Sequence, residues 1–229
     1  MKKEIRRKGL AVAAVCCLLS AGMAFPSQAA KKLNRWEKLL EMYRQDDSTD
    51  RLIFVKYQGD SKARVELYKK IQKSGEYKWK KLLSCGAYVG KKGINKKEEG
   101  DKKTPTGTFS ILSAFGIKKN PGTELPYTKV NKYHYWSEEK ETYNQLVDVR
   151  MLGREEMAGE HLIDFKPAYN YALVIGYNEE CEYGKGSAIF LHAKGEKHYT
   201  AGCVAVSRAN VKRIVKAATE KTRICIYKE

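Results

Sequence analysis

From residue 51 onward, apolar residues occur in short runs that are rich in β-branched and aromatic side chains. Turn residues at 59–61 and 74–75 separate the first three runs, and this spacing predicts an antiparallel β meander. Further runs of the same kind follow, so strands should dominate and helices should be few. The predicted strands are 52–57, 63–71, 77–89, 107–112, 145–150, 171–177, 188–192 and 223–227.

Two segments have helical periodicity instead. Residues 31–45 carry Leu33, Trp36 and Leu40 at intervals of three and four, which predicts an amphipathic helix. Its apolar stripe should pack on the main domain, with a partner-binding face as the alternative. A second helix is predicted after Ser207, which can cap it, because Val211 and Ile214 begin an apolar face there.

The N-terminal residues 1–30 have the order of a secretory signal peptide. Five basic residues precede an apolar run at 9–19, and small residues follow at 27–30. The run is short for a membrane span, although an uncleaved anchor is the alternative. We therefore expect an exported protein at the extracellular face or in the cell wall, with 31–48 as a helix and linker and 49–229 as one domain.

The chain is strongly basic, with a formal net charge of +17, of which +13 remains without residues 1–30. Such a charge favours polyanionic surroundings, and an exported chain meets anionic wall polymers rather than nucleic acid. No stable protein partner is predicted. Four cysteines lie beyond residue 30, and their irregular spacing suits no metal site, so no metal or cofactor is expected. They are Cys85, Cys181, Cys203 and Cys225.

The candidate chemistry lies near the C-terminal end. An apolar strand ends on His192, and after a ten-residue loop comes Thr200-Ala201-Gly202-Cys203-Val204. A cysteine nucleophile needs a neighbouring base, and a histidine at a strand end can supply it. Gly202 allows close approach of a substrate, and the N–H groups of the loop from Thr200 to Val204 can receive an oxyanion.

Three ordered blocks resemble the L,D-transpeptidase catalytic domain of the YkuD type. They are Thr104-Pro105-Thr106-Gly107-Thr108-Phe109, the strand that ends at His192, and the loop that ends at Cys203. The resemblance covers roughly 51–227 and makes 49–229 a catalytic domain. It implies a mostly-β, sandwich-like fold of mixed sheets with a helix after the cysteine loop.

The resemblance also implies a reaction, acyl transfer on peptidoglycan stem peptides. Cys203 would attack the third residue of a tetrapeptide stem and expel the terminal D-alanine, with His192 as the base. The thioester would then pass to a neighbouring stem, to a free D-amino acid or to water. Ala201 and Ala205 depart from the family pattern, and Ala193 has no side chain to orient the imidazole, so a backbone carbonyl is expected in that role.

Three flanking residues are candidates for substrate binding: His198, Tyr199 and Arg208. Two alternatives to the transpeptidase stay open. One is a basic wall-binding protein that has lost catalysis, and the other is a different secreted cysteine peptidase or transpeptidase. The sequence argues against a sortase, which would place its cysteine at a strand end with a downstream arginine on another strand. A catalytic Cys203 should react with alkylating probes below the pH of an ordinary thiol, whereas a relic should not.

Overall fold

A computed structural model describes residues 32–229 of the chain. The predicted signal peptide or anchor, residues 1–30, lies outside the described residues. Residues Asn34–Glu229 form one compact unit. Within the described residues, no helix combines the length and the apolar character that crossing a membrane requires.

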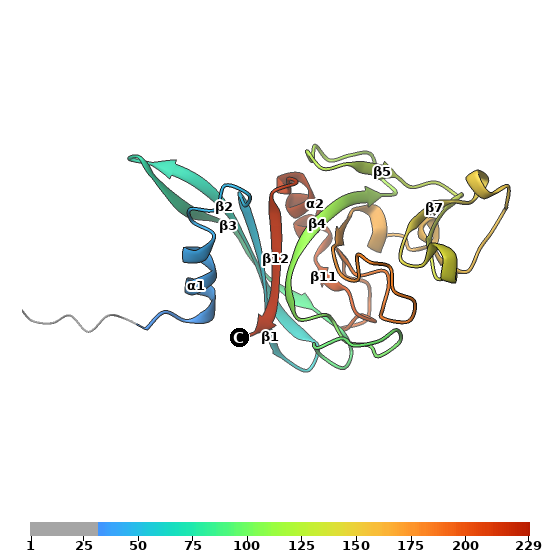
Figure 1. Ribbon diagram of the computed structural model, residues 1–229, viewed down its shortest axis with the longest axis horizontal. Helices are drawn as coiled ribbons and strands as arrows, with labels where there is room; N and C mark the ends of the chain where they lie inside the picture. The colour runs from blue at the N-terminus through green and yellow to red at the C-terminus, as the bar shows by residue number, and fades with distance from the viewer. Residues whose placement is uncertain (1–31) are drawn as a thin grey trace, which may run out of the picture. The chain divides into compact units, whose positions relative to one another are not determined.

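Helix α1 (Arg35–Met42) is the predicted amphipathic helix, shorter than predicted at both ends. The Asn34 side chain caps its first turn, and the Glu37 carboxylate accepts a hydrogen bond from the backbone N–H of Asn34. Trp36 packs on Phe54, with ring centroids 5.0 Å apart. The apolar stripe therefore contacts the sheet, as predicted (Figure 1).

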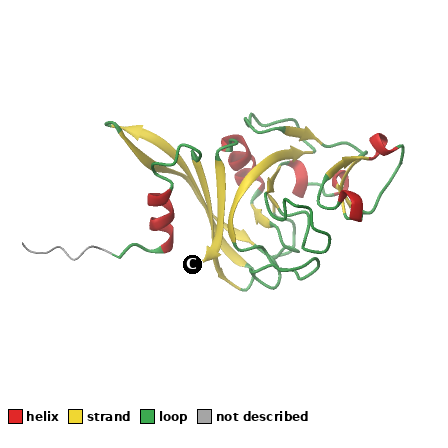
Figure 2. Cartoon of the chain, viewed as in Figure 1, coloured by secondary structure: helices red, strands yellow, loops and turns green. Residues whose placement is uncertain are grey.

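Nine strands form one mixed sheet in the order β12-β1-β2-β3-β11-β10-β9-β4-β5, shown in yellow in Figure 2. Strands β1, β2 and β3 are the predicted antiparallel meander. The first half of β4 also pairs with β12, so the sheet closes on itself. The strands are β1 (Arg51–Gly59), β2 (Lys62–Lys73), β3 (Glu76–Tyr88), β4 (Gly107–Gly116), β5 (Tyr127–Lys129), β9 (Ala172–Ile175), β10 (Phe190–Ala193), β11 (Val204–Val206) and β12 (Thr222–Lys228).

A second, three-stranded sheet is formed by β7-β6-β8 between β5 and β9 in the sequence. The strand predicted at 145–150 is only partly present, because a 3-10 helix begins at Val149 and the Asp148 side chain caps it. The elements here are β6 (His134–Ser137), η1 (Lys140–Thr142), β7 (Leu146–Asp148), η2 (Val149–Leu152), β8 (Gly159–His161), η3 (Leu162–Asp164) and η4 (Ala168–Asn170).

Helix α2 (Arg208–Ala217) follows β11 directly and is capped by the Ser207 hydroxyl, as predicted. Its apolar residues Val211, Ile214 and Val215 are fully buried in the main core with side chains from the closed sheet. A separate aromatic cluster lies on the other face of β10 and includes Phe115, Trp136, Tyr169, Phe190 and Cys203.

The predicted fold class is confirmed: strands make up 40% and helices 16%, and the sheet is mixed. The helix after the cysteine loop is present as well. The structure adds one feature that strand prediction did not contain, the pairing that joins the end strand β12 to β4, next to the other end of the sheet.

Candidate active site

Adjacent parallel strands bring Cys203 and His192 to one face of the sheet. Leu191 pairs with Val204 and His192 with Ala205, so Cys203 lies beside Phe190. Side chains alternate along a strand, and Leu191 and Val204 point into the main core. His192 and Cys203 therefore share the opposite face, where the aromatic cluster packs.

The thiol of Cys203 is held by two backbone groups. The sulfur donates to the carbonyl oxygen of Ala188 at 3.1 Å and accepts from the N–H of Phe190 at 3.3 Å. The residue is only 8% exposed. Ala188 has φ of 53°, a left-handed conformation that is uncommon for a residue with a side chain.

The imidazole of His192 is oriented by a backbone carbonyl, as the sequence led us to expect. Its Nδ1 lies 2.9 Å from the carbonyl oxygen of Ala193. A carbonyl only accepts, so this contact places the proton on Nδ1 and leaves Nε2 free to act as a base. The ring of Tyr169 packs edge to face against the imidazole, with centroids 5.3 Å apart.

Burial keeps both partners neutral in the substrate-free protein. It raises the pKa of the Cys203 thiol to about 12, with a further contribution from the nearby Glu160 carboxylate. Burial also lowers the pKa of His192 to about 4. The expected thiol of unusually low pKa is therefore wrong for this state, and the thiol must lose its proton to the imidazole during reaction.

Glu160 and Tyr169 form a polar pair behind the two candidate catalytic residues. The Tyr169 hydroxyl donates to Glu160 Oε2 at 2.6 Å, and the tyrosine is 3% exposed. Desolvation, together with the neighbouring Glu138 and Glu99 carboxylates and against the lowering effect of the Tyr169 hydrogen bond, raises the pKa of Glu160 to about 7. A carboxyl group that titrates near neutral pH therefore lies within electrostatic range of Cys203.

Hydroxyl groups fix the loop that carries the nucleophile. Thr200 Oγ1 donates to the Cys203 carbonyl at 2.7 Å and accepts from the Gly202 N–H at 3.1 Å. Thr104 Oγ1 donates to the same carbonyl at 3.3 Å. A side chain on Gly202 would lie 3.1 Å from the Lys103 carbonyl oxygen, so glycine allows the Thr104 segment to approach closely.

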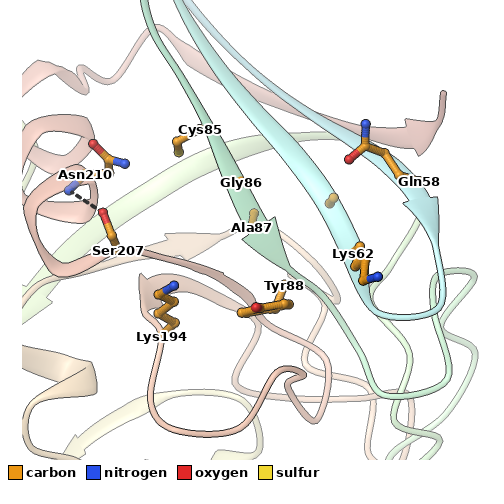
Figure 3. A pocket seen from close by; sticks show the side chains of 10 residues that line it. Gln58, Lys62, Cys85, Gly86, Ala87, Tyr88, Lys194, Ser207 and Asn210 are labelled. Atoms are coloured by element: carbon orange, nitrogen blue, oxygen red, sulfur yellow. Dashed lines mark hydrogen bonds between the residues drawn. The ribbon is translucent and has the colours of Figure 1, made fainter.

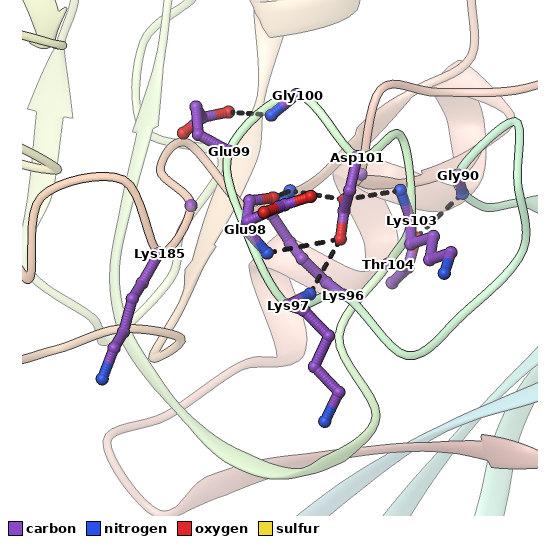
Figure 4. A network of polar contacts seen from close by, with 12 residues as sticks. Gly90, Lys96, Lys97, Glu98, Glu99, Gly100, Asp101, Lys103, Thr104 and Lys185 are labelled. Atoms are coloured by element: carbon purple, nitrogen blue, oxygen red, sulfur yellow. Dashed lines mark hydrogen bonds and ion pairs between the residues drawn. The ribbon is translucent and has the colours of Figure 1, made fainter.

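A buried ion pair supports this loop from the other side (Figure 4). Lys96 Nζ lies 3.0 Å from Asp101 Oδ1, and their side chains are 2% and 9% exposed. Asp101 also accepts the backbone N–H groups of Lys97 and Lys103. The charge of Lys96 lowers the pKa of Cys203, against the larger effect of burial.

The three candidates for substrate binding lie on either side of the nucleophile loop in the sequence. His198 is exposed and stacks on Tyr88, with centroids 5.2 Å apart. Tyr199 is half-buried, and the Lys91 ammonium lies 5.2 Å from its ring centroid. Arg208 is exposed at the first turn of α2. None of the three contacts Cys203 through a hydrogen bond among the described residues, and their roles stay predictions.

The four described cysteines are all free thiols. Cys225 is buried, whereas Cys85 and Cys181 are half-buried. Among the described residues, no group of three His, Cys, Asp or Glu side chains could hold a metal ion.

Sequence reasoning missed the supporting residues of this site. Glu160, Tyr169 and Lys96 lie in segments that have no motif, and Lys96 is buried although it lies in a segment rich in charged residues. One usable signal is the run of aromatic residues that ends at Trp136, because such a run is typical of a core or of a groove wall. The Trp136 ring lies 4.8 Å from that of Phe190, directly behind the nucleophile.

Comparison with known proteins identifies the family of this chain. The family model described as the L,D-transpeptidase catalytic domain, YkuD, matches residues 50–226. The chain therefore belongs to the YkuD family of L,D-transpeptidase catalytic domains, as the three sequence blocks indicated. No curated protein matches it.

Three solved structures are similar to this chain at low identity. The helical cell shape determining protein Pgp2 from Campylobacter jejuni is 17% identical, with a TM-score of 0.41, over 80% of this chain and 49% of that one. Bd1075 from Bdellovibrio bacteriovorus is 16% identical, with a TM-score of 0.42, over 79% and 48%. A mutant L,D-transpeptidase from Enterococcus faecium is 11% identical, with a TM-score of 0.35, over 78% and 50%. The matches thus span about half the length of those proteins.

Proposed function

We propose that this protein is an exported L,D-transpeptidase that acts on peptidoglycan stem peptides through a thioester on Cys203. Membership of the family supports the class of reaction. The observation that carries the assignment is the shared face of β10 and β11, which bears both the thiol and, two register positions away, an imidazole with a free Nε2.

In the first step, His192 Nε2 takes the thiol proton and the thiolate attacks the carbonyl carbon of the third stem residue. The peptide bond to the terminal D-alanine breaks, and the imidazolium returns its proton to the leaving amine. The resting pair is neutral, so the thiol proton has to move to His192 as the sulfur attacks the carbonyl carbon.

In the second step, an acceptor amine attacks the thioester and gives its proton to His192. The carbon–sulfur bond breaks, and the thiolate is protonated again by the imidazolium. An amine of a neighbouring stem gives a cross-link, a free D-amino acid gives exchange, and water gives a shortened stem. Thr200 and Thr104 serve this chemistry by fixing the Cys203 carbonyl, which holds the nucleophile loop in one orientation.

A basic wall-binding protein without catalysis is the second candidate. The observation that favours it is the buried thiol with its raised pKa, together with Ala205 beside His192. The two candidates differ in whether products depend on the Cys203 sulfur.

The experiment is to incubate the full chain with disaccharide-tetrapeptide muropeptides and an added D-amino acid, and to identify the products by mass. Cys203→Ala is the matched variant, and Cys181→Ala removes a thiol from outside the site. Dimers, exchanged stems or tripeptides that require Cys203 but not Cys181 support the transpeptidase. If stems with differing third residues give no such product, the wall-binding candidate takes its place.

A further inference from the structure

Two hollows follow one another between helix α2 and the β2–β3 hairpin. The first, of about 430 Å³, lies beside Ser207 and Asn210 at the start of the helix (Figure 3). The second, of about 440 Å³, lies beside Arg213 and Lys216. Both are lined by α2 on one side and by β2 and β3 on the other, and Arg213 crosses the second hollow by donating a hydrogen bond from Nη2 to the Leu82 carbonyl at 3.3 Å. We call the two hollows together the α2–hairpin groove.

The groove is present because β3 pairs with its neighbour β11 only at the end of β3. β3 pairs with β11 at one position, Tyr88 with Ala205, and the chain then turns from β11 into α2. The edge of β3 before Tyr88 faces the helix across the groove instead of a further strand. In Figure 3, Cys85 lies opposite Asn210 across this gap.

The lining is cationic throughout. Of the residues that line the two hollows, six are lysine or arginine and none is acidic. Arg51 pairs with Asp50, but the other five have no carboxylate partner among the described residues. The six are Arg51, Lys62, Lys69, Lys194, Arg213 and Lys216.

Three other hollows in the described part of the chain contain at least one acidic residue, and in one of them Glu196 lies with Lys194 and Arg208. A hollow beside Lys70 and Lys221 contains Asp47 and Asp50, which balance the two lysines. A smaller one contains Glu99 and Glu138 and no cation. The basic charge of the chain is therefore not spread evenly over its hollows, and the α2–hairpin groove carries an unbalanced share.

The dimensions of the groove suit an extended ligand with several charges. Nine residues separate Ser207 from Lys216, which corresponds to roughly 14 Å along a helix. Cations line both ends of this span, so a single small anion would leave one end unoccupied. Leu67, Leu82 and Leu83 line the second hollow and offer an apolar surface to the carbon atoms between successive charges.

The groove is separate from the candidate nucleophile. Cys85 and Ala87 line it, and they belong to the main core or pack on it, whereas Cys203 belongs to the aromatic cluster on the other face of the sheet. A ligand in the groove therefore leaves the Cys203 site open.

We propose that the α2–hairpin groove binds a linear phosphodiester polyanion of the cell wall, such as poly(glycerol phosphate). Phosphodiesters keep one negative charge per unit at all physiological pH values, and arginine and lysine are the side chains that recognise them. This inference rests on the proposed export to the cell wall but not on the proposed catalysis, since a catalytically inactive chain would bind in the same way.

The test measures binding of fluorescently labelled poly(glycerol phosphate) to the full chain by anisotropy, at several salt concentrations. Arg213→Glu should weaken binding at least tenfold and reduce its salt dependence, because a phosphate contact is lost. Lys212→Glu is the matched control, since it makes the same charge change at the next position of α2 but lies outside the groove. It should weaken binding less than threefold.

Lys69→Glu, across the groove on β2, repeats the test if Arg213→Glu fails to fold by circular dichroism. Cys203→Ala should bind like the original chain. Equal losses in Arg213→Glu and Lys212→Glu would mean that only net charge matters and would overturn the proposal. Absence of binding at low salt would also overturn the proposal. The cations would then be explained by protection of the β3 edge against pairing with a strand of another chain. Equal affinity for poly-glutamate or a single-stranded DNA oligonucleotide would overturn the assignment to a wall phosphodiester.

Discussion

The Cys203 sulfur donates its hydrogen bond to the Ala188 carbonyl and not to the imidazole of His192. Ala188 presents this carbonyl because its backbone is left-handed, and Asn144 Oδ1 accepts its N–H at 3.1 Å. The resting thiol is therefore satisfied by the main chain. Catalysis in this site requires the thiol proton to give up its hydrogen bond to that carbonyl and to move to His192 Nε2. Substrate binding therefore has to bring about this change.

The first prediction concerns the reactivity of this thiol. In the substrate-free protein, iodoacetamide should label Cys203 slowly at neutral pH, because burial and Glu160 raise its pKa to about 12. Glu160→Gln removes the carboxylate and should raise the labelling rate about three- to tenfold at a given pH, since one pKa unit is a tenfold change in thiolate. Mass spectrometry of the Cys203 peptide separates this signal from the other cysteines.

Glu156→Gln is the control, because it removes an exposed carboxylate four residues away from Glu160. It should leave the labelling rate of Cys203 unchanged. An equal rate in Glu160→Gln and the original chain would show that the Glu160 carboxylate does not act on the thiol.

The second prediction concerns stability and pH. Folding raises the pKa of Glu160 from an ordinary value to about 7, so the folded state holds a proton that the unfolded state has released. The stability from this group is complete below the unfolded pKa and is lost as pH rises through about 7. Glu160→Gln carries no such proton, and its stability relative to the original chain should rise by about 1–2 kcal/mol from acidic to mildly alkaline pH.

Urea unfolding at about pH 5 and about pH 8 measures this difference. His192 has the opposite sign, since its lowered pKa makes stability fall as pH drops through about 4. Comparing variant with original chain at each pH removes that contribution. A constant difference between the two proteins would contradict a raised pKa at Glu160.

The strands whose bounds were predicted best are the long ones, because they have enough residues for alternation to show. The meander β1 to β3 contains long runs with turn residues between them, and its bounds were predicted within a few residues. Strands β5, β8 and β11 have three residues each, too few for any period, and they exist because distant partners pair with them. Closure through β4 and β12 depends on such pairing and has no local signal.

The residues of the candidate site also differ in whether a local sequence pattern could predict them. Cys203 and His192 were predicted because each ends a recognisable local block, and Ala193 was expected to act through its backbone because it has no polar side chain. Glu160 and Tyr169 had no such block, since only the return of β8 onto β6 and the packing of Tyr169 on Phe190 bring them to the thiol. Contacts of this kind are set by the tertiary fold.

The third prediction tests the hydroxyl that joins the Thr104 block to the nucleophile loop. Thr104 is fully buried, and its hydroxyl accepts from the Gly90 N–H at 2.9 Å while it donates to the Cys203 carbonyl. Thr104→Val keeps the shape but leaves the buried N–H without this partner, which should cost about 1–3 kcal/mol. Thr106→Val in the same block changes an exposed hydroxyl and should cost less than about 1 kcal/mol. Urea unfolding of both variants measures the difference, and equal losses would contradict a special role for Thr104.

The fourth prediction concerns the buried pair of Lys96 and Asp101 (Figure 4). Lys96→Met removes the cation but leaves Asp101 enclosed, and breaking a buried pair in this way should destabilise the protein by about 3–5 kcal/mol. Lys97→Met, at an exposed position next to it, should change stability by less than about 0.5 kcal/mol. The double variant Lys96→Met with Asp101→Asn removes the stranded charge and should recover part of the loss. If the loss of stability in the double variant equals the sum of the losses in its two single variants, the charge interaction between Lys96 and Asp101 does not stabilise the protein.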